Sequence, residues 1–462
     1  MTASTETPTT AESGRHAVVV GGGLAGISAA LALADRGWRT TLLEARPRLG
    51  GATYSFSRHG LPVDTGQHVL LRCYTAHRAL LERLGVSADV PLQPRFAVPV
   101  LRPGHPPVWL RRSTLPAPAH LLPALLGYRL LRPADRLSAC RAALALRHVD
   151  PEDPATDRRT FGDWLTAHGQ SENAVEAVWR LICLPALNLE PAEASLALAA
   201  KVFRTALLDD VTSADIAVPR VPLGALYDEP ARRALTRAGV RVRTGCRVVG
   251  VTGDDTAPLV RTSDGDMTAD AVVVAVPHQQ ATALLPDSAC PDRERWTALK
   301  ASPIVNVHVR YDRPVTSLAF AAGVRTPVQW VFDRTTATGG PGQYLVVSLS
   351  GADDEIGQRS ADLLASYLAA LAELFPAACG ARVLDAFVTR EPRATFRQAA
   401  GTASVRPGTR TRWRSVVLAG AWTATGYPDT TEGAVRSGLA AAGALGLPST
   451  LAFSHEQREV LT

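Results

Sequence analysis

The hydrophobic pattern near the start of the chain predicts a buried strand that leads directly into a helix. Residues 17–20 are apolar and three of them are valine, a run typical of a strand that is buried on both faces. Small and apolar residues follow at 24–30, after the spacing Gly21-x-Gly23-x-x-Gly26. The predicted order is therefore strand, tight turn and helix.

The three glycines have the spacing of a dinucleotide-binding turn. The first permits the tight turn, the second lets the backbone approach a pyrophosphate, and the third lets the helix pack closely on the strand. The free N–H groups at the start of the helix favour negative charge. A second strand is predicted at 40–43 and ends in Glu44, where an acid that binds a ribose is expected. The pattern predicts a Rossmann-type unit, but it does not distinguish NAD from FAD.

Later parts of the chain alternate between helical and strand patterns. Leucines at helical spacing predict a helix over 76–84 that ends at Gly85. Residues 115–149 and 160–208 are rich in leucine and alanine, and we expect them to form a helical cap over an apolar pocket. Strand patterns return in three stretches, 239–251, 269–277 and 301–350, and the last of these suits a second sheet.

Length and composition limit the possible classes of protein. A chain of 462 residues is too long for one simple core, so about two or three domains are expected. The six cysteines form no Cys-x-x-Cys pair and the eleven histidines show no ligand spacing, so we expect no metal site and a reducing cytoplasm. No apolar run reaches the roughly 18 residues that cross a bilayer. Residues 1–14 lack the basic start and apolar core of a secretory signal.

The net charge of +6 says little about partners. Lys201 and Lys300 are the only lysines among 49 basic residues, and this bias toward arginine reflects composition more than a binding surface. Aromatic residues are few and do not alternate with the basic ones, so no nucleic-acid partner is expected.

A distinctive stretch begins at the end of the second strand: Glu44-Ala45-Arg46-x-Arg48-x-Gly50-Gly51, then Ala52. It resembles the flavin-dependent amine oxidase and carotenoid desaturase superfamily, whose FAD-binding half continues with such an Arg-x-Gly-Gly segment. The resemblance implies FAD as the cofactor. It also implies that the segment 415–445 lies under the isoalloxazine ring, where a helix N-terminus stabilises negative charge. The residues implied in binding FAD are Gly21, Gly23, Leu24, Ala25, Gly26, Glu44, Ala45, Arg46, Gly50, Gly51, Ala52, Val248, Gly420, Ala421, Glu432, Gly433 and Ala434.

The segment 415–445 departs from the superfamily at one position. In the superfamily an acid follows the glycine that ends the strand, and it bonds the ribityl chain of FAD. Here Ala421 follows Gly420. We therefore expect weaker FAD binding, or another group in the role of this acid.

Two further stretches, 61–86 and 422–438, narrow the resemblance. They are similar to hydroxysqualene dehydroxylases, also called squalene-associated FAD-dependent desaturases, and the likeness extends from about residue 16 to 446. It implies an FAD-dependent oxidoreductase of squalene and hopanoid biosynthesis, which replaces the hydroxyl group of a C30 isoprenoid alcohol by hydrogen. A carotenoid or isoprenoid desaturase is the main alternative. A flavin amine oxidase and a non-catalytic lipid-binding relative are weaker ones.

Candidate catalytic residues follow from the same resemblance. His68 lies in a loop implied to reach the flavin, and it is a candidate acid because the pKa of histidine is close to neutral. Glu432 is the second candidate. His68 could instead fix its loop, and Glu432 could instead complement the dipole of its helix. Gln67, Trp422 and Tyr427 are candidates for the substrate pocket, although Trp422 and Tyr427 could equally fill the core.

Residues 115–149 have the pattern of a surface that contacts a membrane. They predict two proline-bounded helices whose apolar faces are edged with arginine. A cytoplasmic protein with peripheral contact to the inner face of the membrane could meet a water-insoluble isoprenoid there. The alternative is a lid that packs on the protein's own core. The residues expected at the membrane are Leu121, Leu122, Leu125, Leu126, Arg129, Arg132, Arg136 and Arg141.

The predicted fold is an α/β protein with three parts. They are a Rossmann-type FAD-binding domain assembled from discontinuous segments, a mixed-sheet substrate domain and a helical cap. No oligomeric state is predicted. The expected division is 1–14 as a disordered tail, 15–86, 236–290 and 406–448 as the FAD-binding domain, 87–235 as the substrate domain with its membrane-facing helical cap, 291–405 as the substrate-domain sheet, and 449–462 as a tail.

Overall fold

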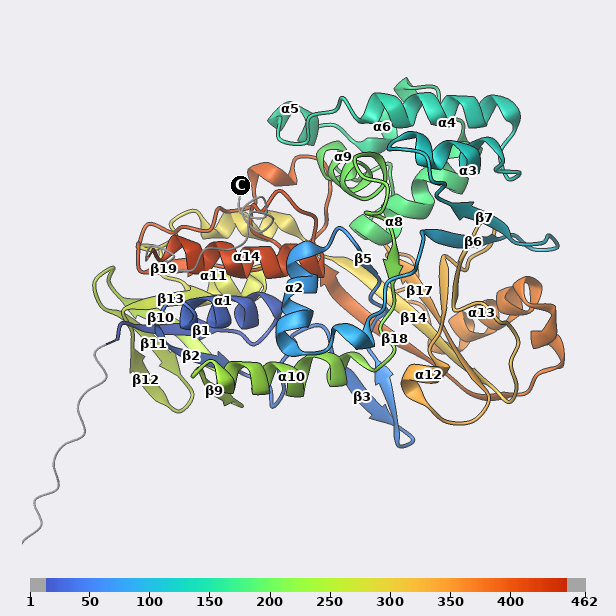
Figure 1. The fold of residues 1–462 in the computed structure, drawn as a ribbon. Helices are drawn as coiled ribbons and strands as arrows, with labels where there is room; N and C mark the ends of the chain where they lie inside the picture. Colours follow the sequence, from blue (N-terminus) through green and yellow to red (C-terminus); the bar gives the residue numbers. More distant parts are fainter. Residues whose placement is uncertain (1–13, 447–462) are drawn as a thin grey trace, which may run out of the picture.

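The computed structural model describes residues 14–446 of the chain, so the tails predicted at 1–14 and 449–462 lie outside the described residues apart from Gly14. Figure 1 shows three parts: a parallel sheet with its helices, a larger sheet beside it, and a layer of helices above the larger sheet. This arrangement confirms the predicted α/β fold with a mixed sheet and a helical cap.

The first sheet has five strands in the order β19-β13-β1-β2-β9, and every neighbouring pair is parallel. The central strand β1 is fully buried, as its valine run predicts. A small antiparallel sheet, β10-β11-β12, is inserted between β9 and β13. The bounds are β1 His16–Val20, β2 Arg39–Glu44, β9 Arg241–Thr244, β10 Val248–Gly253, β11 Pro258–Thr262, β12 Gly265–Thr268, β13 Ala271–Val274 and β19 Val416–Leu418.

Five helices accompany the parallel sheet, and α1, α2, α10 and α14 share one hydrophobic core with it. Leu226, Tyr227 and Leu235 of α10 complete this core. The predicted boundary at residue 235 is therefore wrong, because α10 belongs with the parallel sheet and not with the substrate domain. The predicted end of α2 is confirmed, since Gly85 adopts a left-handed φ of 77°. The bounds are α1 Leu24–Ala34, α2 Thr75–Leu84, α10 Leu223–Arg237, α11 His278–Leu284 and α14 Thr431–Ala444.

Glycines let two of these helices pack without side chains between them. A Cβ atom on Gly26 would lie 1.9 Å from Gly21 O, so α1 meets the turn that precedes it. A Cβ atom on Gly438 would lie 2.1 Å from Ala25 O, so α14 meets the backbone of α1. The last helix of the described chain therefore packs directly on the first.

The second sheet has seven strands in the order β18-β14-β17-β16-β15-β6-β7, and it is mixed because β15 and β6 run parallel. Val305, Val307 and Val309 of β14 pack in one core with α13. Residues at the alternating positions of the strand point to the opposite face. The bounds are β6 Ala97–Leu101, β7 Val108–Arg111, β14 Ser302–Tyr311, β15 Phe320–Gly323, β16 Trp330–Asp333, β17 Gln343–Ser350, β18 Val383–Thr395 and α13 Ser360–Leu374.

The helical layer packs on the other face of the large sheet, over strands β16, β15, β6 and β7. Its core contains Phe161, Trp179 and Phe203 and continues into Phe320 and Phe332 of the sheet. Among the described residues, no helix is long and apolar enough to cross a membrane. The bounds are η2 Ala119–Leu121, α3 Leu122–Leu126, α4 Pro133–Leu146, α5 Pro154–Asp157, α6 Phe161–Ala167, α7 Glu172–Ala174, η3 Val175–Arg180, α8 Leu181–Leu187, α9 Leu196–Phe203 and η4 Arg204–Leu208.

The two helices expected within 115–149 differ in size. The second is α4, with 14 residues, but the first is reduced to the short η2 turn and the five residues of α3. Pro123 lies in the first turn of α3 and Gly127 caps its end, and these two residues limit the helix on either side. The remaining elements are β3 Ser55–Arg58, β4 Leu61–Asp64, β5 Leu70–Leu71, η1 Ser87–Asp89, β8 Ile216–Ala217, η5 Arg293–Leu299, α12 Thr335–Thr338, η6 Pro376–Gly380 and η7 Thr402–Ser404.

The contact between α14 and α1 predicts that replacing glycine by alanine on α14 lowers stability at the contact but not elsewhere on the helix. Gly438→Ala places a Cβ atom against a backbone oxygen that cannot move freely, so we expect a loss of about 1–3 kcal/mol in the free energy of unfolding. Gly443→Ala is the matched control, because it lies on the same helix with open space around it and should be neutral or stabilising. Denaturant unfolding compares the two variants. Equal stability of both would contradict the close packing.

Candidate functional site

The glycine turn between β1 and α1 lies at the carboxyl edge of the parallel sheet, where nucleotides bind in open α/β folds. Gly21 has a φ of 108°, a conformation that favours glycine. Its N–H donates to Leu43 O, which ties the turn to β2. No side chain caps the first turn of α1, so the N–H groups there are open to a ligand.

Glu44 closes the turn from the neighbouring strand. Its Oε2 accepts from the N–H of Gly22 at 2.7 Å, and its Oε1 accepts from the N–H of Arg46 at 2.8 Å. Each carboxylate oxygen keeps a second lone pair. Glu44 can therefore still accept bonds from the hydroxyl groups of a ribose.

The Arg-x-Gly-Gly segment packs directly on the glycine turn. A Cβ atom on Gly51 would lie 2.9 Å from the Cα of Gly23. Arg48 lies 3.4 Å above the ring of Tyr54 and donates through Nη1 to Gly51 O at 2.9 Å. Its Nη2 is buried without a hydrogen-bond partner, and burial lowers the pKa of its guanidinium. A cationic donor without a partner, next to glycine backbone that carries no side chains, fits the pyrophosphate of FAD.

The C-terminal segment approaches the same edge of the sheet. Gly420 follows β19 with a φ of 142°, and its N–H donates to Ser437 Oγ of α14 at 2.8 Å. Thr430 caps α14 by accepting from the N–H of Gly433. Ala421 is buried and offers no side-chain acceptor. Other residues expected to bind FAD differ in exposure. Val248 and Ala434 are partly buried, Ala45 and Ala52 are exposed, and Leu24 and Ala25 are buried at the start of α1.

Arg406 holds the loop that begins at Ala421, and the sequence analysis missed it. This buried guanidinium donates to the carbonyl oxygens of Ala421, Trp422, Thr423 and Tyr427 at 2.5–3.3 Å. Burial lowers its pKa to about 10, so it remains charged at neutral pH. A single arginine before β19 matches no sequence motif. Its role could not be predicted because it depends on how the loop after β19 folds back onto it.

Glu432 is an anchor rather than a free acid. Its carboxylate accepts from the N–H groups of Ala76 and His77 at 3.2 and 2.8 Å, and it pairs with Arg436 at 2.7 Å. These bonds occupy both oxygens of the carboxylate. Through these bonds Glu432 joins the start of α14 to the start of α2.

The two aromatic candidates for the pocket differ. Trp422 is 5% exposed, packs in the core of the nucleotide-binding part with its ring 5.1 Å from that of Trp296, and donates to Val276 O. Trp422 therefore packs as a core residue, which is one of the two roles that the sequence left open for it. Tyr427 is half-buried, with Lys201 Nζ 4.8 Å and Arg436 Cζ 4.4 Å from its ring centre, and it can still line a pocket.

Gln67 and His68 lie in the loop after β4 and are half-buried. Burial lowers the pKa of His68, because the apolar surroundings disfavour the charged ring. His68 is therefore neutral near pH 7. The base of the loop is fixed by Asp64, which forms a buried ion pair with Arg334 at 3.0 Å.

The large sheet presents polar side chains beneath this loop, which were not among the predicted site residues. Asn306 donates to Thr65 O at 3.0 Å, and Thr389 donates to the same oxygen at 3.3 Å. His308 is fully buried between Tyr344 OH and Thr389 Oγ1, at 2.7 and 2.9 Å. Burial lowers its pKa to about 3, so it is neutral. The alternation of polar and valine residues in β14 was the available signal for this polar face.

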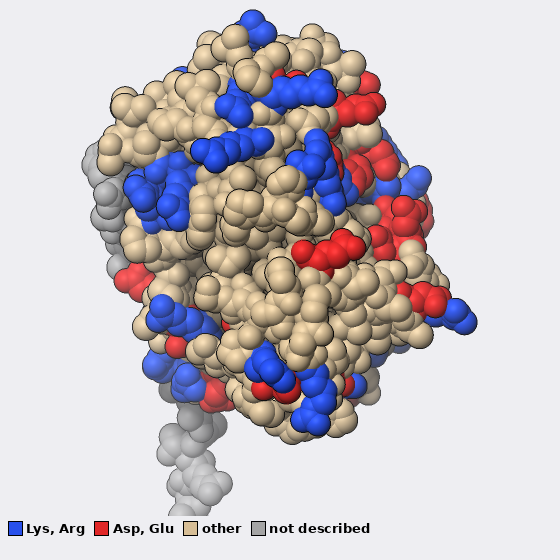
Figure 2. All heavy atoms as spheres, turned by 90° about the vertical axis from the view of Figure 1, so that its right-hand side faces the viewer, with Lys and Arg blue, Asp and Glu red and all other residues tan. Residues whose placement is uncertain are grey.

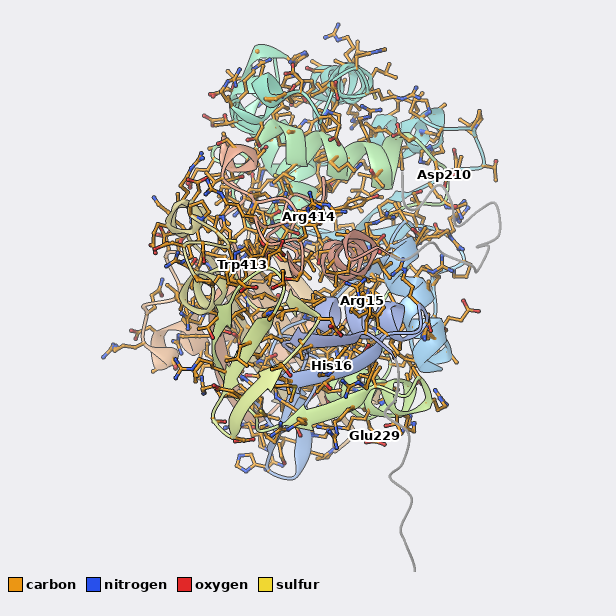
Figure 3. All side chains as sticks on the ribbon, turned by 90° about the vertical axis from the view of Figure 1, so that its left-hand side faces the viewer. Arg15, His16, Asp210, Glu229, Trp413 and Arg414 are labelled. Atoms are coloured by element: carbon orange, nitrogen blue, oxygen red, sulfur yellow. The ribbon has the colours of Figure 1, made fainter. Side chains whose placement is uncertain are left out.

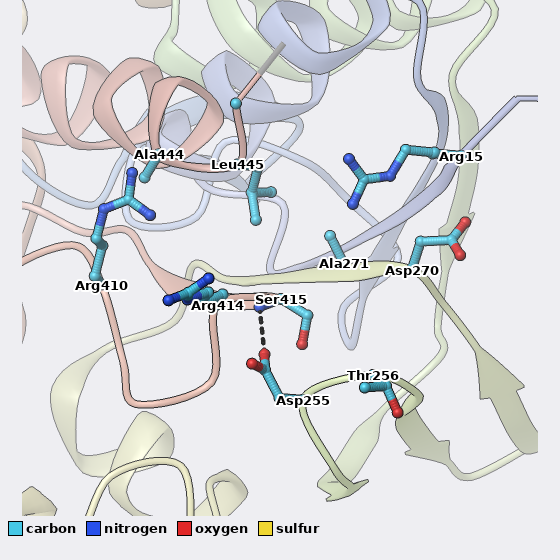
Figure 4. A pocket seen from close by; sticks show the side chains of 11 residues that line it. Arg15, Asp255, Thr256, Asp270, Ala271, Arg410, Arg414, Ser415, Ala444 and Leu445 are labelled. Carbon is cyan, nitrogen blue, oxygen red and sulfur yellow. Dashed lines mark hydrogen bonds between the residues drawn. The ribbon is translucent and has the colours of Figure 1, made fainter.

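A separate cavity of about 360 Å³ lies at the amino edge of the parallel sheet. Figure 3 places Arg15 and Arg414 on this side of the molecule, and Figure 4 shows both side chains at the cavity with Arg410. Asp255 Oδ1 accepts from the N–H of Ser415 there at 2.8 Å. The glycine turn lies at the opposite edge, so this cavity is not the expected cofactor site.

Comparisons with known proteins agree with this geometry. The family described as flavin containing amine oxidoreductase matches residues 24–446. A hydroxysqualene dehydroxylase from Rhodopseudomonas palustris is 30% identical over 444 residues, which cover 92% of this chain and 96% of the relative. A 15-cis-phytoene desaturase from Glycine max is 26% identical over 96% of this chain and 81% of its own.

Solved structures show the same fold. A structure of putrescine oxidase superposes with a TM-score of 0.71 at 19% sequence identity, over 93% of this chain and 98% of that one. Cyclohexylamine oxidase from Brevibacterium oxydans gives a TM-score of 0.67 over 94% of this chain and 98% of its own. The resemblance stated from the sequence is confirmed: the chain belongs to the flavin-containing amine oxidoreductase family, is an FAD-dependent oxidoreductase, and is similar within that family to the hydroxysqualene dehydroxylases.

Proposed function

We propose that the chain catalyses the reductive dehydroxylation of hydroxysqualene to squalene in squalene and hopanoid biosynthesis. The observation that carries this proposal is the 30% identity with the Rhodopseudomonas palustris relative over 92% of the chain. Relatives of the same name from Sinorhizobium fredii and Zymomonas mobilis are 28% and 27% identical over 92% and 95% of the chain. Similarity over nearly the whole length includes the cap and the large sheet as well as the FAD motifs.

The proposed reaction makes three demands on the protein. A hydroxyl group leaves poorly, so it needs a proton or a strong hydrogen bond. Its departure beside a double bond leaves an allylic cation, which water would capture. When bound, reduced FAD supplies the hydride that completes the reaction. The chain must therefore hold FAD, donate a proton and exclude water.

The aromatic side chains on β15 and β16 of the large sheet would help to exclude water. Phe332 has its ring centre 6.3 Å from that of Phe320 and 6.2 Å from that of Trp330. These rings continue into the core of the helical layer. A long isoprenoid chain would find few competing polar groups there.

The residues around the glycine turn would bind FAD. The N–H groups of Leu24 and Ala25 and the orphaned Nη2 of Arg48 would hold the pyrophosphate, and Glu44 would bind the ribose. The start of α14 at Gly433 would face the flavin. The other proposed contacts are Gly21, Gly23, Gly26, Ala45, Arg46, Gly50, Gly51, Ala52, Val248, Gly420, Ala421 and Ala434, while Gln67 and Tyr427 would face the substrate.

A carotenoid or isoprenoid desaturase is the second candidate function. Relatives named zeta-carotene desaturase, from Zea mays and Arabidopsis thaliana, are 25% identical over 91% of this chain. The same apolar surroundings would serve a desaturation, in which FAD would accept the hydride. The two candidates therefore differ in redox direction. An amine oxidase and a non-catalytic lipid-binding relative remain weaker candidates.

Product analysis separates the candidates. We expect the anaerobically reduced enzyme to convert hydroxysqualene to squalene with one equivalent of flavin oxidised per product. The oxidised enzyme should leave squalene and phytoene unchanged. Desaturated product from the oxidised enzyme, with no squalene from the reduced enzyme, would favour the desaturase. A purified protein that neither contains nor binds FAD would indicate the non-catalytic relative.

Gly23→Val tests the FAD site. A Cβ atom at this position meets only Gly51 Cα at 3.8 Å, so the fold should persist while the branched side chain occupies the place of the pyrophosphate. We expect the purified variant to retain less than about a tenth of the wild-type flavin. Gly357→Val, at an exposed glycine with open space, is the control and should keep its flavin. Full flavin absorbance in Gly23→Val would reject the assignment.

Ala421→Asp tests the missing acid. A carboxylate here would add a charge-assisted bond to the ribityl chain, and the Nη2 of Arg406 already lies 2.9 Å from Ala421 O. Such a bond contributes roughly 1.5–3 kcal/mol, so we expect FAD to bind about tenfold more tightly. Titration of the apoprotein measures the change. Weaker binding would mean that another residue already has this role.

We propose that the helical layer also contacts a membrane, which would let a cytoplasmic protein reach a water-insoluble substrate. Leu115, Leu126, Leu137 and Leu144 are 44–54% exposed. Figure 2 shows basic side chains among uncharged ones over the upper part of its face, where the helical layer lies. The contact surface differs from the sequence expectation, because Leu121, Leu122 and Leu125 are half-buried and Arg136 bonds the carbonyl oxygens of Leu126 and Leu131.

Co-sedimentation with vesicles tests this surface. We expect stronger binding to anionic than to neutral vesicles, and weaker binding at high salt. Changing the exposed Arg129, Arg132 and Arg141 to glutamine should weaken binding about a hundredfold, at about 1 kcal/mol for each charge near the surface. The same change at Arg410, Arg412 and Arg414, which are also exposed, is the control. Equal binding to both vesicle types would contradict the membrane contact and would indicate that the helical layer is a lid packed on the protein's own core.

A further inference from the structure

The proposed reaction needs a proton on the leaving hydroxyl group, and neither expected donor suits this step. Both oxygens of the Glu432 carboxylate already accept hydrogen bonds, from Arg436 and from two backbone N–H groups. Burial lowers the pKa of His68, so its ring carries no spare proton near pH 7. A different group that holds a proton is required.

Asp429 immediately precedes Thr430, the residue that caps α14. Its N–H donates to Gln398 Oε1 at 2.9 Å, and its Oδ2 accepts from the N–H of Phe396 at 2.9 Å. Within residues 14–446, Oδ1 accepts no hydrogen bond, and the side chain is half-buried. One oxygen thus fixes the carboxyl group and the other is left for a ligand.

The partners of Asp429 place it where the three parts of the molecule meet. Phe396 and Gln398 directly follow β18 of the large sheet. Gln398 is fully buried and donates to Leu187 O at the end of α8 in the helical layer. Asn188, the next residue, donates to Ser302 O and Thr395 Oγ1 of the sheet. Asp429 therefore joins the flavin-binding segment to the sheet and cap that would enclose the substrate.

The surroundings favour a protonated carboxyl group. Burial raises the pKa of Asp429 to about 6, and Arg406 and the Phe396 N–H only partly oppose this effect. The other charged groups nearby already have partners: Glu432 and Arg436 pair on α14, Lys201 lies over the ring of Tyr427, and Asp157 accepts from Ser195 and Ala403. A carboxyl group poised near the working pH suits general acid catalysis.

We propose that Asp429 is the residue that protonates the leaving hydroxyl group, an inference that rests on the proposed dehydroxylation. Its O–H bond breaks and the proton joins the substrate oxygen. The carbon–oxygen bond then breaks, and water leaves with that electron pair. A hydride from the reduced cofactor, with its two electrons, reduces the carbon. The cofactor would be left oxidised, and a proton from solvent would restore the carboxyl group of Asp429.

Asp429→Asn tests the proton donor while keeping the size and the acceptor for the Phe396 N–H. We expect unchanged flavin content and a kcat at least about 100-fold lower, with rates expressed per bound flavin. Only the protonated carboxyl group can donate, so wild-type kcat should be constant at low pH and fall as the pH rises through the pKa. The variant should lose this pH dependence, and Asp429→Glu should recover part of the rate and the profile.

A substrate with a better leaving group provides the second test. In the acetate ester of the same alcohol, acetate is the leaving group and departs with little need for protonation. Asp429→Asn should therefore convert this ester nearly as fast as the wild type does. A residue with a merely structural role would slow both substrates equally. Glu355→Gln is the matched control, because Glu355 is a half-buried carboxyl group with a raised pKa beside α13, and its kcat and pH profile should match those of the wild type.

The outcomes distinguish this inference from the proposed function. No squalene from the reduced wild-type enzyme would overturn the dehydroxylase itself. Squalene formation by the wild type, with an unchanged kcat and pH profile in Asp429→Asn, would overturn the role of Asp429 alone. Equal slowing of the alcohol and the ester would also overturn it.

Discussion

The close approach of α14 to α1 is the constraint on which the cofactor site depends. Ala25 O and the position of Gly438 leave no space for a side chain between the two helices. Each helix follows a strand of the same parallel sheet, so both N-termini lie at its carboxyl edge. Segments from opposite ends of the described chain are thereby held together, and two helix N-termini, which favour negative charge, lie at one edge of the sheet.

Glu432 extends this arrangement to the wall of the site. Its carboxylate accepts hydrogen bonds from the backbone at the start of α2, and its ion pair with Arg436 holds it in place. The loop that carries Gln67 and His68 precedes α2, and its base is held separately by the ion pair of Asp64 with Arg334. The loop is thus fixed at both ends, so its half-buried side chains are positioned relative to the start of α14.

The sequence predicted the features that local backbone geometry imposes. The glycine turn, the buried β1 and the end of α2 at Gly85 each follow from a few neighbouring residues. Features set by distant partners were not predictable in this way. Trp422 is a core residue because Trp296 and Val276 surround it, and Glu432 is an anchor because α2 begins beside it. The place of α10 likewise depends on a core that α1 and α14 complete.

Arg406 explains how the C-terminal segment can keep its shape without the acid of the superfamily. Four carbonyl oxygens of its loop accept from this guanidinium, so the loop is organised by a cation and not by a carboxylate. Within the described residues, no carboxylate lies within ion-pair distance of Arg406. With alanine at 421, its positive charge is offset mainly by neutral dipoles. Without a carboxylate at 421 to oppose it, this positive charge would favour negative charge on a flavin bound beside the loop.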